Sequence, residues 1–195
     1  SENAFRDVNI AFANELSMVS DKLGVDIWEV IRLANRHPRV NILSPGPGVG
    51  GHCIAVDPWF IVHSAPEITP LIRTAREVND AKIDYVVDHA SRLIADNSGR
   101  VALFGLAFKA NVDDFRESPA LKVAVDLAKR FGDRVAIVEP YTTELPSLFD
   151  GTNATLVDID AALLDCTVII VLVDHDIFKS VPPEERDGKI IYDTR

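Results

Sequence analysis

The sequence is poor in cysteine, in positive charge and in long hydrophobic runs, and each shortage excludes a class of protein. The two cysteines, Cys53 and Cys166, lie far apart in unlike surroundings, so a disulfide framework is not expected and a reducing compartment fits. The net charge of −10 disfavours binding to nucleic acid or to an anionic membrane. No apolar run approaches the length of a membrane span and no signal peptide is visible, so we expect a soluble protein of the cytoplasm.

Signs of metal binding are also missing. The five histidines show no ligand spacing with one another or with the cysteines, so no metal site is expected. What is present is a hydrophobic fraction of 47% in a chain of 195 residues. Such a chain is typical of an ordered globular protein with one large domain or two small ones.

The densest local feature runs from Ser44 to Phe60 and reads SPGPGVGGHCIAVDPWF. Glycine lets a backbone approach a ligand and proline stiffens its path, so this stretch predicts a shaped loop. The pair Asp57-Pro58 is typical of an N-cap followed by a first helical residue, which places Cys53 just ahead of a helix, where amide dipoles favour a thiolate. Cys53 is therefore either a nucleophile or, like most lone cysteines, a small buried hydrophobic residue.

The first half of the chain has the apolar periodicity of helices over residues 3–23 and 27–36, and a short helix is expected from Pro58. A longer pattern over 70–96 predicts a helix of about 40 Å. Such a helix links two domains, forms a dimer interface, or is a single long core helix. Two of its arginines, Arg73 and Arg76, are expected on a solvated face or at an interface.

The second half alternates apolar strands with helices, which indicates a Rossmann-like parallel sheet. The predicted fold class is therefore α/β: a helical domain over 1–98 with a long linking helix, followed by a Rossmann-like parallel-sheet domain over 99–195. Strands are expected at 101–106, 135–138, 154–157, 168–172 and 190–192, and helices at 118–131 and 158–164.

Ligands of such sheets bind beyond the carboxyl ends of the strands. Lys109 and Arg116 follow the first strand and suit phosphates, with Ser118 opening a helix behind them; the alternative is an ordinary polar loop. No G-x-G-x-x-G follows this strand, so this half is a poor candidate for an NAD site. Cys166 is expected to be structural, and a loop role is favoured over a ligand contact for Asp174-His175.

Longer motifs carry a resemblance to a known family. GPGVGGHCIAVDPWF resembles the active-site segment of the UDP-sugar 6-dehydrogenases, the UDP-glucose/GDP-mannose dehydrogenase family. AFANELS resembles the first helix of its central domain, LFGLAFKANVDDFRESPA the start of its UDP-binding domain, and YDTR the last strand of that domain. Within the family, HCIAVDPWF and LIRTAREVND look most similar to enzymes that act on UDP-N-acetyl-D-mannosamine, so the resemblance implies this substrate.

The resemblance implies an oxidation of the sugar C6 alcohol to a carboxylate, with two NAD⁺ consumed, to supply a uronic acid for a surface polysaccharide. It implies that Cys53 adds to the intermediate aldehyde as a thiolate, giving a thiohemiacetal that is oxidised to a thioester and hydrolysed. Asp57 would organise the proton transfers and the water, and Asn3 would act near the developing oxyanion.

Binding roles are carried over residue by residue. Lys109 corresponds to the lysine that binds the UDP-sugar, and Arg116 to the arginine that reaches towards NAD. Arg39 is a candidate for a substrate contact donated across a dimer, and Glu139-Pro140-Tyr141 for part of a uridine pocket. The loop residues implied to line the sugar and the diphosphate are Pro45, Gly46, Gly48, Gly50 and Gly51.

The resemblance covers the family's central and UDP-binding domains. It implies that the NAD-binding domain and a catalytic lysine lie before Ser1. We therefore expect a piece of a longer enzyme, homodimeric through its helical domain and inactive on its own. The alternatives are a UDP-sugar-binding and dimerisation module without activity, or a 6-dehydrogenase for UDP-N-acetylglucosamine or UDP-glucose.

Overall fold

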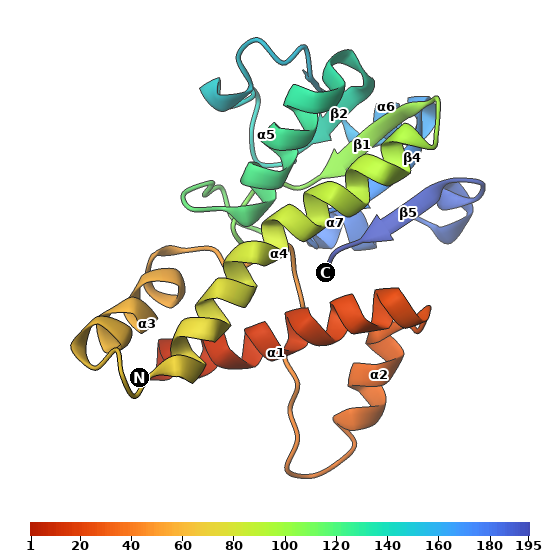
Figure 1. Cartoon of the computed structure of the whole chain (residues 1–195). Helices are drawn as coiled ribbons and strands as arrows, with labels where there is room; N and C mark the ends of the chain where they lie inside the picture. The colour runs from red at the N-terminus through yellow and green to blue at the C-terminus, as the bar shows by residue number, and fades with distance from the viewer. The chain divides into compact units, whose positions relative to one another are not determined.

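The computed structural model describes all residues from 1 to 195 (Figure 1). The chain forms two compact units, Ser1–Lys82, here called the helical unit, and Ile83–Arg195, here called the sheet unit. The division falls inside the longest helix, α4 (Pro70–Ala95). The expected functional division at 98/99 stays a prediction.

The helical unit contains three helices before α4, and they follow the predicted periodicity. Gly24 ends the first helix in the left-handed region with φ 67°, a conformation that favours glycine. Asp26 begins the second helix by accepting a hydrogen bond from the N–H of Trp28 at 2.9 Å. The predictions of helices over 3–23 and 27–36 are thereby confirmed. The helices are α1 (Glu2–Leu23), α2 (Ile27–Ala34) and α3 (His52–Ser64).

Helix α3 begins earlier than the sequence predicts. It starts at His52, and the preceding Gly51 caps it with φ 85°, which only glycine adopts readily. Pro58 therefore lies inside the helix, where its ring removes one i→i−4 hydrogen bond. The predicted start at Pro58 is wrong because the glycine turn begins the helix first and the proline does not end it.

The sheet unit is built on five parallel strands in the order β3-β2-β1-β4-β5. This confirms the expected Rossmann-like sheet and its alternation with helices. The strands are β1 (Arg100–Phe104), β2 (Val135–Val138), β3 (Thr155–Leu156), β4 (Cys166–Val171) and β5 (Ile190–Asp193), and the helices after β1 are α5 (Pro119–Phe131), α6 (Ile159–Asp165) and α7 (Asp176–Lys179).

Both faces of this sheet are covered. Val101 and Leu103 of β1 belong to one apolar cluster with residues of α4 and α5. Ala102 and Phe104 of the same strand belong to a second cluster with residues of α6 and α7. Alternate residues of a strand point to opposite faces, so the apolar run at 101–106 correctly predicts a strand buried on both sides.

The strands β1 and β4 approach each other closely where they end. Gly105 has φ 93°, and a Cβ at this position would lie 2.4 Å from the Cβ of Val173. The strand order reverses between β1 and β4. Such a switch point is where open α/β sheets bind their ligands.

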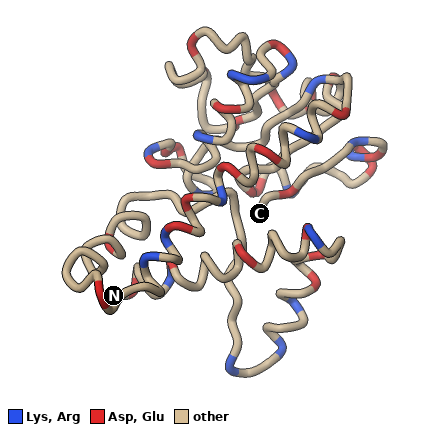
Figure 2. Tube along the Cα trace, viewed as in Figure 1, with Lys and Arg blue, Asp and Glu red and all other residues tan.

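The helical unit has a different interior, because both apolar clusters lie in the sheet unit. Where α1 meets α4, many of the buried side chains are polar. Figure 2 shows residues of both charge signs along α4, and none of the helices combines the length and apolar character that a bilayer span requires. The buried polar side chains of this unit are Asp7, Asn14, Ser17, Ser20, Arg76, Asn79 and Lys82.

Four of these side chains, Asp7, Arg76, Asn79 and Asn14, form what we call the buried polar ladder. Arg76 pairs with Asp7 at 2.6 Å, and Asn79 donates to the Asp7 carboxylate at 2.8 Å and to its backbone carbonyl at 3.0 Å. Asn14 donates to the side-chain oxygen of Asn79 at 2.9 Å. The expectation of a solvated face is wrong for Arg76, because α1 supplies a buried carboxylate that the pattern of α4 alone cannot reveal.

Lys82 is the other cation of this interior. Its side chain is 3% exposed and donates to the hydroxyl of Ser17 at 2.7 Å. Burial lowers the pKa of Lys82 from 10.5 to about 8, although Asp21 opposes the shift. Between these two pH values the unfolded chain binds more protons than the folded chain, so the stability of the protein should rise with pH across that window.

We expect Lys82→Met to raise the free energy of unfolding at pH 7 by about 1–3 kcal/mol, because the variant no longer buries a charge. The rise in stability between pH 8 and pH 10.5 should disappear with it. Urea unfolding at several pH values measures both effects. Lys22→Met, at an exposed position of α1, is the control and should change stability by less than about 0.5 kcal/mol. An unchanged rise in Lys82→Met would contradict its assignment to Lys82.

Candidate functional site

The thiol of Cys53 is exposed at the beginning of α3. It follows the capping Gly51 by two positions, so it lies in the first turn, where backbone N–H groups lack partners within the helix. The alternative that Cys53 is a small buried hydrophobic residue is therefore wrong. Cys166, by contrast, is 1% exposed in β4, as expected of a structural cysteine.

Asn3 and Asp57 meet beside this turn. The side-chain amide of Asn3, in the first turn of α1, donates to the carboxylate of Asp57 at 2.7 Å. Asp57 follows Cys53 by four residues on α3, which puts both on the same side of the helix. The fold thus brings together residues 54 positions apart in sequence, and both are residues for which the resemblance implies catalytic roles.

The glycine loop that leads into α3 is fixed from inside the helical unit. The N–H of Gly46 donates to the side-chain oxygen of Asn14 at 2.9 Å, which attaches the loop to the buried polar ladder. Residues 40–51 contain no charged side chain (Figure 2). Of the residues implied to line the substrate, Pro45 and Gly46 are buried, and Gly48, Gly50 and Gly51 are half-buried.

Arg39 is exposed in the loop over residues 35–42, which follows α2. Both hydrogen-bonding groups of the Asn35 side chain close this loop, by donating to the carbonyl of Ile42 at 3.0 Å and accepting from its N–H at 2.7 Å. None of the hydrogen bonds of Arg39 reaches the glycine loop of its own chain. This placement leaves Arg39 projecting from the unit that carries it.

The loop between β1 and α5 carries the two predicted cations of the sheet unit. Lys109 is exposed, with its ammonium 5.4 Å from the ring centre of Phe108. Arg116 is also exposed, and its guanidinium grips both oxygens of Asp114 at 2.9 and 2.7 Å. Ser118 caps α5 at the end of this loop, as the sequence predicts.

The sequence analysis named Glu139 as a candidate for a uridine pocket, but it did not predict that this carboxylate is buried at the same edge of the sheet. Glu139, directly after β2, accepts hydrogen bonds from the N–H of Leu106 at 2.7 Å and from the N–H of Tyr141 at 3.1 Å. His175 Nε2 lies 3.4 Å from Oε2, the oxygen that accepts from Leu106. Burial alone would raise the pKa of Glu139, but the nearby imidazole of His175 and the hydrogen bonds from these two N–H groups hold it below its usual value. The available sequence signal was an acidic residue directly after β2 and a histidine four residues after the end of β4.

A dinucleotide does not fit the sheet unit. Dinucleotide-binding sheets have a glycine-rich turn after the first strand for the pyrophosphate and an acidic residue after the second strand for a ribose. Here the turn after β1 has one glycine, Gly105, and Val173 fills the space beside it. The acidic residue after β2, Glu139, is turned onto backbone N–H groups. The sheet unit therefore lacks the two features by which dinucleotide-binding sheets hold the pyrophosphate and the ribose.

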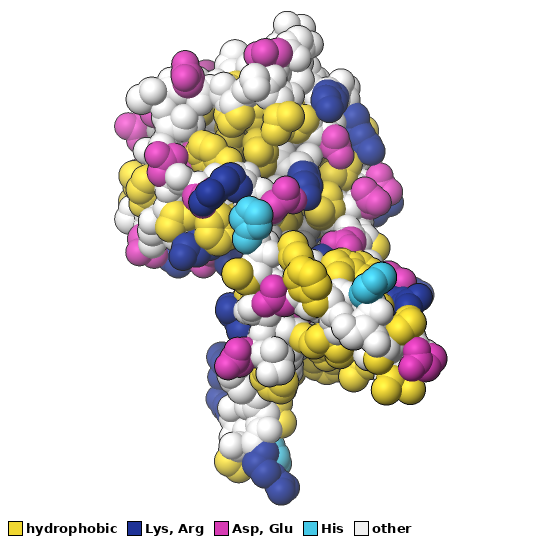
Figure 3. All heavy atoms as spheres, turned by 90° about the vertical axis from the view of Figure 1, so that its left-hand side faces the viewer, with side chains coloured by type: hydrophobic (Ala, Val, Ile, Leu, Met, Phe, Trp, Pro, Cys, Tyr) yellow, Lys and Arg dark blue, Asp and Glu magenta, His cyan; other side chains and the backbone are white.

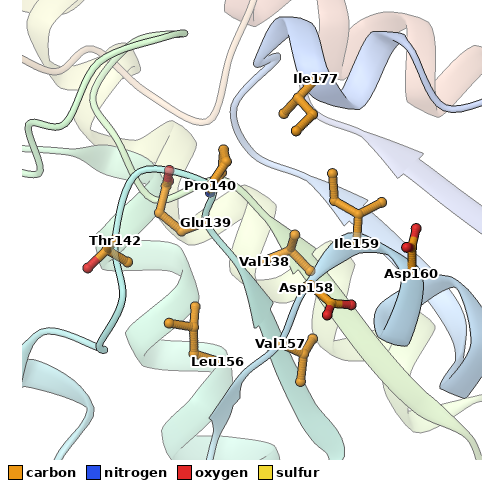
Figure 4. Close-up of a pocket in the computed structure, with 10 residues that line it drawn as sticks. All are labelled: Val138, Glu139, Pro140, Thr142, Leu156, Val157, Asp158, Ile159, Asp160 and Ile177. Atoms are coloured by element: carbon orange, nitrogen blue, oxygen red, sulfur yellow. The ribbon is translucent and has the colours of Figure 1, made fainter.

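A cavity of about 590 Å³ opens at the ends of β2 and β3 (Figure 4). Its walls are mostly apolar, and the lining includes three carboxylates, those of Glu139, Asp158 and Asp160. Asp158 is already engaged, because it caps α6 by accepting from the N–H of Ala161 at 2.7 Å. Of the residues implied to form a uridine pocket, Glu139 and Pro140 line this cavity. No group of three or more His, Cys, Asp or Glu side chains is arranged to hold a metal ion anywhere in residues 1–195.

The two units define a class of protein, in which a Rossmann-like nucleotide-binding fold follows a helical unit that presents a thiol. Family models match both parts. Residues 1–81 match the central domain of the UDP-glucose/GDP-mannose dehydrogenase family, and residues 102–195 match its UDP binding domain. The chain belongs to the UDP-glucose/GDP-mannose dehydrogenase family.

Curated relatives match along the whole chain. The UDP-N-acetyl-D-mannosamine dehydrogenase of Salmonella typhi is 52% identical over 204 residues, covering 100% of this chain and 48% of the relative. The NDP-N-acetyl-D-galactosaminuronic acid dehydrogenase of Ralstonia nicotianae is 53% identical over 196 residues, covering 100% of this chain and 46% of the relative. The chain thus spans about half the length of the curated relatives it matches.

A solved structure agrees with the fold. The UDP-N-acetyl-mannosamine dehydrogenase Cap5O of S. aureus is 43% identical and superposes with a TM-score of 0.81, covering 100% of this chain and 46% of that one. A UDP-glucose dehydrogenase of Pyrobaculum islandicum superposes with a TM-score of 0.83 at 28% identity, over 100% of this chain and 46% of that one. The fold is therefore shared by relatives named for different sugars.

Asn14→Ala tests how the glycine loop is held. The change leaves the N–H of Gly46 and the oxygen of Asn79 without their partner, and we expect it to lower the free energy of unfolding by about 2–3 kcal/mol. Hydrogen exchange of residues 45–51 should become faster. Asn9→Ala removes a similar side-chain bond from an exposed part of the same helix and should change neither quantity. Unaltered exchange in Asn14→Ala would show that the ladder does not fix the loop.

Proposed function

We propose that the whole protein is an NAD-dependent UDP-sugar 6-dehydrogenase that oxidises a C6 alcohol to a carboxylate. The single observation that carries this proposal is the exposed Cys53 in the first turn of α3, with the bonded pair of Asn3 and Asp57 beside it. A thiol can form the thioester, a carboxylate can accept the proton of the attacking water, and an amide can stabilise the oxyanion. Membership of the family supports the same reaction.

The proposed substrate is UDP-N-acetyl-D-mannosamine, and the product is UDP-N-acetyl-D-mannosaminuronate. The Salmonella typhi relative named for this sugar supports the choice. The Ralstonia nicotianae relative is equally similar and is named for N-acetyl-D-galactosaminuronic acid. We therefore keep a second candidate specificity, for another UDP-hexose or UDP-N-acetylhexosamine, including UDP-N-acetylglucosamine and UDP-glucose.

The thiol is needed because an aldehyde has no hydrogen on a carbinol carbon to give up in a second oxidation. The Cys53 thiolate forms a bond to the aldehyde carbon C6, and the carbonyl oxygen takes up a proton. The resulting thiohemiacetal again has a carbinol hydrogen, and loss of that hydride together with the hydroxyl proton leaves a thioester. Water then adds to C6, the C–S bond breaks, and the thiolate leaves as the carboxylate forms.

Asp57 is proposed to transfer protons, and Asn3 to stabilise the negative charge that develops on the oxygen. The Asp57 carboxylate takes the proton of the attacking water, and its bond to Asn3 fixes its orientation. The Asn3 amide also has a second N–H, which is suited to a developing oxyanion on C6. NAD⁺ would be the electron acceptor, with two molecules consumed for each sugar. We propose that its main binding site lies outside residues 1–195.

The sheet unit contributes the binding of the nucleotide in this proposal. Lys109 is exposed at the carboxyl edge of the strands, where an ammonium suits a diphosphate. Arg116 is proposed to reach towards the cofactor, for which it would share its guanidinium with Asp114. The Pro45–Gly51 backbone and Arg39 are proposed to contact the sugar part, Arg39 from a second subunit.

A second candidate function concerns residues 1–195 alone, as a UDP-sugar-binding and dimerisation module without activity. The missing dinucleotide site in the sheet unit favours it. The two candidates differ in one assay, because this chain alone should bind UDP and form no NADH with UDP-sugar and NAD⁺. We propose a cytoplasmic location for either, since the exposed Cys53 thiol suits a reducing compartment.

A homodimer through the helical unit is the proposed assembly. Three large apolar side chains recur every seven residues along α1, and we call Phe5, Phe12 and Val19 the α1 stripe; they are 71%, 56% and 46% exposed. The helical unit exposes further large apolar side chains, and hydrophobic atoms are prominent on the molecular surface (Figure 3). Apolar surface of this extent, in a unit with a polar interior, is typical of an interface.

The activity of the intact protein tests the proposal. We expect two NADH per UDP-N-acetyl-D-mannosamine and a uronate product. Cys53→Ala should lower uronate formation by at least about 10³-fold, because no thioester can form. Cys166→Ala, which removes the buried thiol, is the control and should retain activity.

Retained uronate formation in Cys53→Ala would rule out the covalent route. The same assay ranks UDP-N-acetyl-D-mannosamine against UDP-N-acetylglucosamine, UDP-N-acetylgalactosamine and UDP-glucose. Faster turnover of UDP-glucose would overturn the proposed specificity.

The α1 stripe makes a separate prediction about assembly. Phe12→Glu places a charge in its centre and should convert the intact protein from a dimer to a monomer, as measured by light scattering. Leu148→Glu introduces the same charge at a position of the sheet unit that is 58% exposed, and it should leave the dimer intact. A dimeric Phe12→Glu variant, or a monomeric wild type, would contradict the proposed interface.

A further inference from the structure

The turn that carries Lys109 is fastened on both sides of this residue. On one side the N–H of Phe108 donates to the carbonyl of Asp114 at 3.0 Å, which closes the base of the loop. On the other side the N–H of Asn111 donates to Nδ1 of His175 at 2.9 Å. Lys109 itself is exposed between these two bonds, so its direction is set by how the turn is held.

Asn111 adopts a conformation that needs support. Its φ is 61°, in the left-handed region that favours glycine and that asparagine tolerates better than other residues. Its side chain donates to the carboxylate of Asp176 at 2.8 Å and accepts from the N–H of Asp176 at 3.0 Å. The hydroxyl of Tyr141 reaches the same side-chain oxygen at 3.4 Å. The backbone bond to His175 is the one contact that fixes the Asn111 N–H directly.

The geometry around His175 assigns its tautomer. Because Nδ1 accepts the N–H of Asn111, Nδ1 carries no proton, and the ring is neutral with its hydrogen on Nε2. Nε2 lies 3.4 Å from Oε2 of Glu139, an electrostatic contact without hydrogen-bond geometry, and it has no hydrogen-bond partner. The side chain is 0% exposed, and the rings of Tyr141 and Phe178 lie 5.0 and 5.2 Å from it. The carboxylate therefore favours the tautomer that leaves Nδ1 free to accept.

We propose that His175 is a positioning residue for binding of the nucleotide sugar. Its Nδ1 lone pair holds the turn from Phe108 to Asn111 in the conformation that presents Lys109, and Glu139 keeps that lone pair available. His175 itself does not touch the ligand. The inference rests on the proposed function, which assigns Lys109 to the diphosphate of the substrate.

Two substitutions separate the two ring nitrogens. In His175→Asn the amide oxygen takes the place of Nδ1 and still accepts from Asn111, whereas the contact with Glu139 is lost. In His175→Gln the amide group takes the place of Nε2, which keeps the contact with Glu139 and loses the one with Asn111. A merely structural role predicts similar damage from both, because each removes the ring and one polar contact.

Binding of UDP to the intact protein, measured by calorimetry, distinguishes these cases. We expect a dissociation constant within about threefold of wild type for His175→Asn and at least about tenfold weaker binding for His175→Gln. In the activity assay His175→Gln should raise KM for the UDP-sugar and change kcat by less than about twofold. Adding Lys109→Met to His175→Gln should weaken binding little further, because both changes act on one contact.

The outcomes that overturn the inference are separate from those that overturn the proposed function. Equal loss of UDP binding in both variants, or loss in neither, refutes the positioning role. Absence of UDP binding in wild type refutes the proposed function and the inference with it. If His175→Gln does not fold, nitrogen NMR of wild type decides: a neutral ring protonated on Nε2 supports the inference, and a proton on Nδ1 overturns it.

Discussion

The helical unit depends on the buried polar ladder between α1 and α4. Asp7, Arg76, Asn79 and Asn14 lose their water on folding. Asp7 bonds to both Arg76 and Asn79, and Asn79 in turn bonds to Asn14. A buried group without its partner costs about 1–3 kcal/mol, so the ladder admits one register of the two helices, whereas apolar side chains would tolerate sliding. Its last member, Asn14, holds Gly46, and the glycine loop leads from there to the cap of α3. The position of Cys53 is therefore set by hydrogen bonds made well away from the thiol.

The sheet unit is held together by apolar packing instead of buried polar contacts. Its strands are clamped between two apolar clusters, and polar contacts are kept for the carboxyl edge, where the loops must be exact in direction. There Glu139 and His175 fasten the loops after β1, β2 and β4 to one another. In dinucleotide-binding sheets an acidic residue after the second strand binds a ribose. Here the residue at that place, Glu139, accepts hydrogen bonds from the backbone of the loops instead. The loops of this unit lie where open α/β sheets bind nucleotides, and the unit lacks the glycine-rich turn of a dinucleotide site.

The sequence predicts most of the fold because hydrophobic periodicity and caps are local. Gly24, Asp26 and Ser118 begin or end helices as their residue types indicate, and five apolar runs become five parallel strands. The predicted start of α3 is wrong because both Gly51 and Pro58 are signals for the beginning of a helix, and Gly51 comes first in the chain. The prediction for Arg76 is wrong for another reason, because its partner Asp7 lies 69 residues away in the sequence. The charge pattern of one helix does not reveal a carboxylate on the helix that faces it. The same limit hides the contact between Glu139 and His175. Of the candidate site, Cys53, Asp57 and Asn3 were available from motifs, but their contact required the fold.

In the proposed reaction, Cys53 becomes covalently attached to the sugar during the oxidation. Rapid acid quenching of the intact protein during turnover of UDP-N-acetyl-D-mannosamine, followed by mass spectrometry of its peptides, measures this directly. We expect a thioester adduct with the mass of the uronyl nucleotide on the peptide that contains Cys53, and none on the peptide with Cys166. Steady uronate formation with both cysteine peptides unmodified, or an adduct on Cys166 alone, would contradict it.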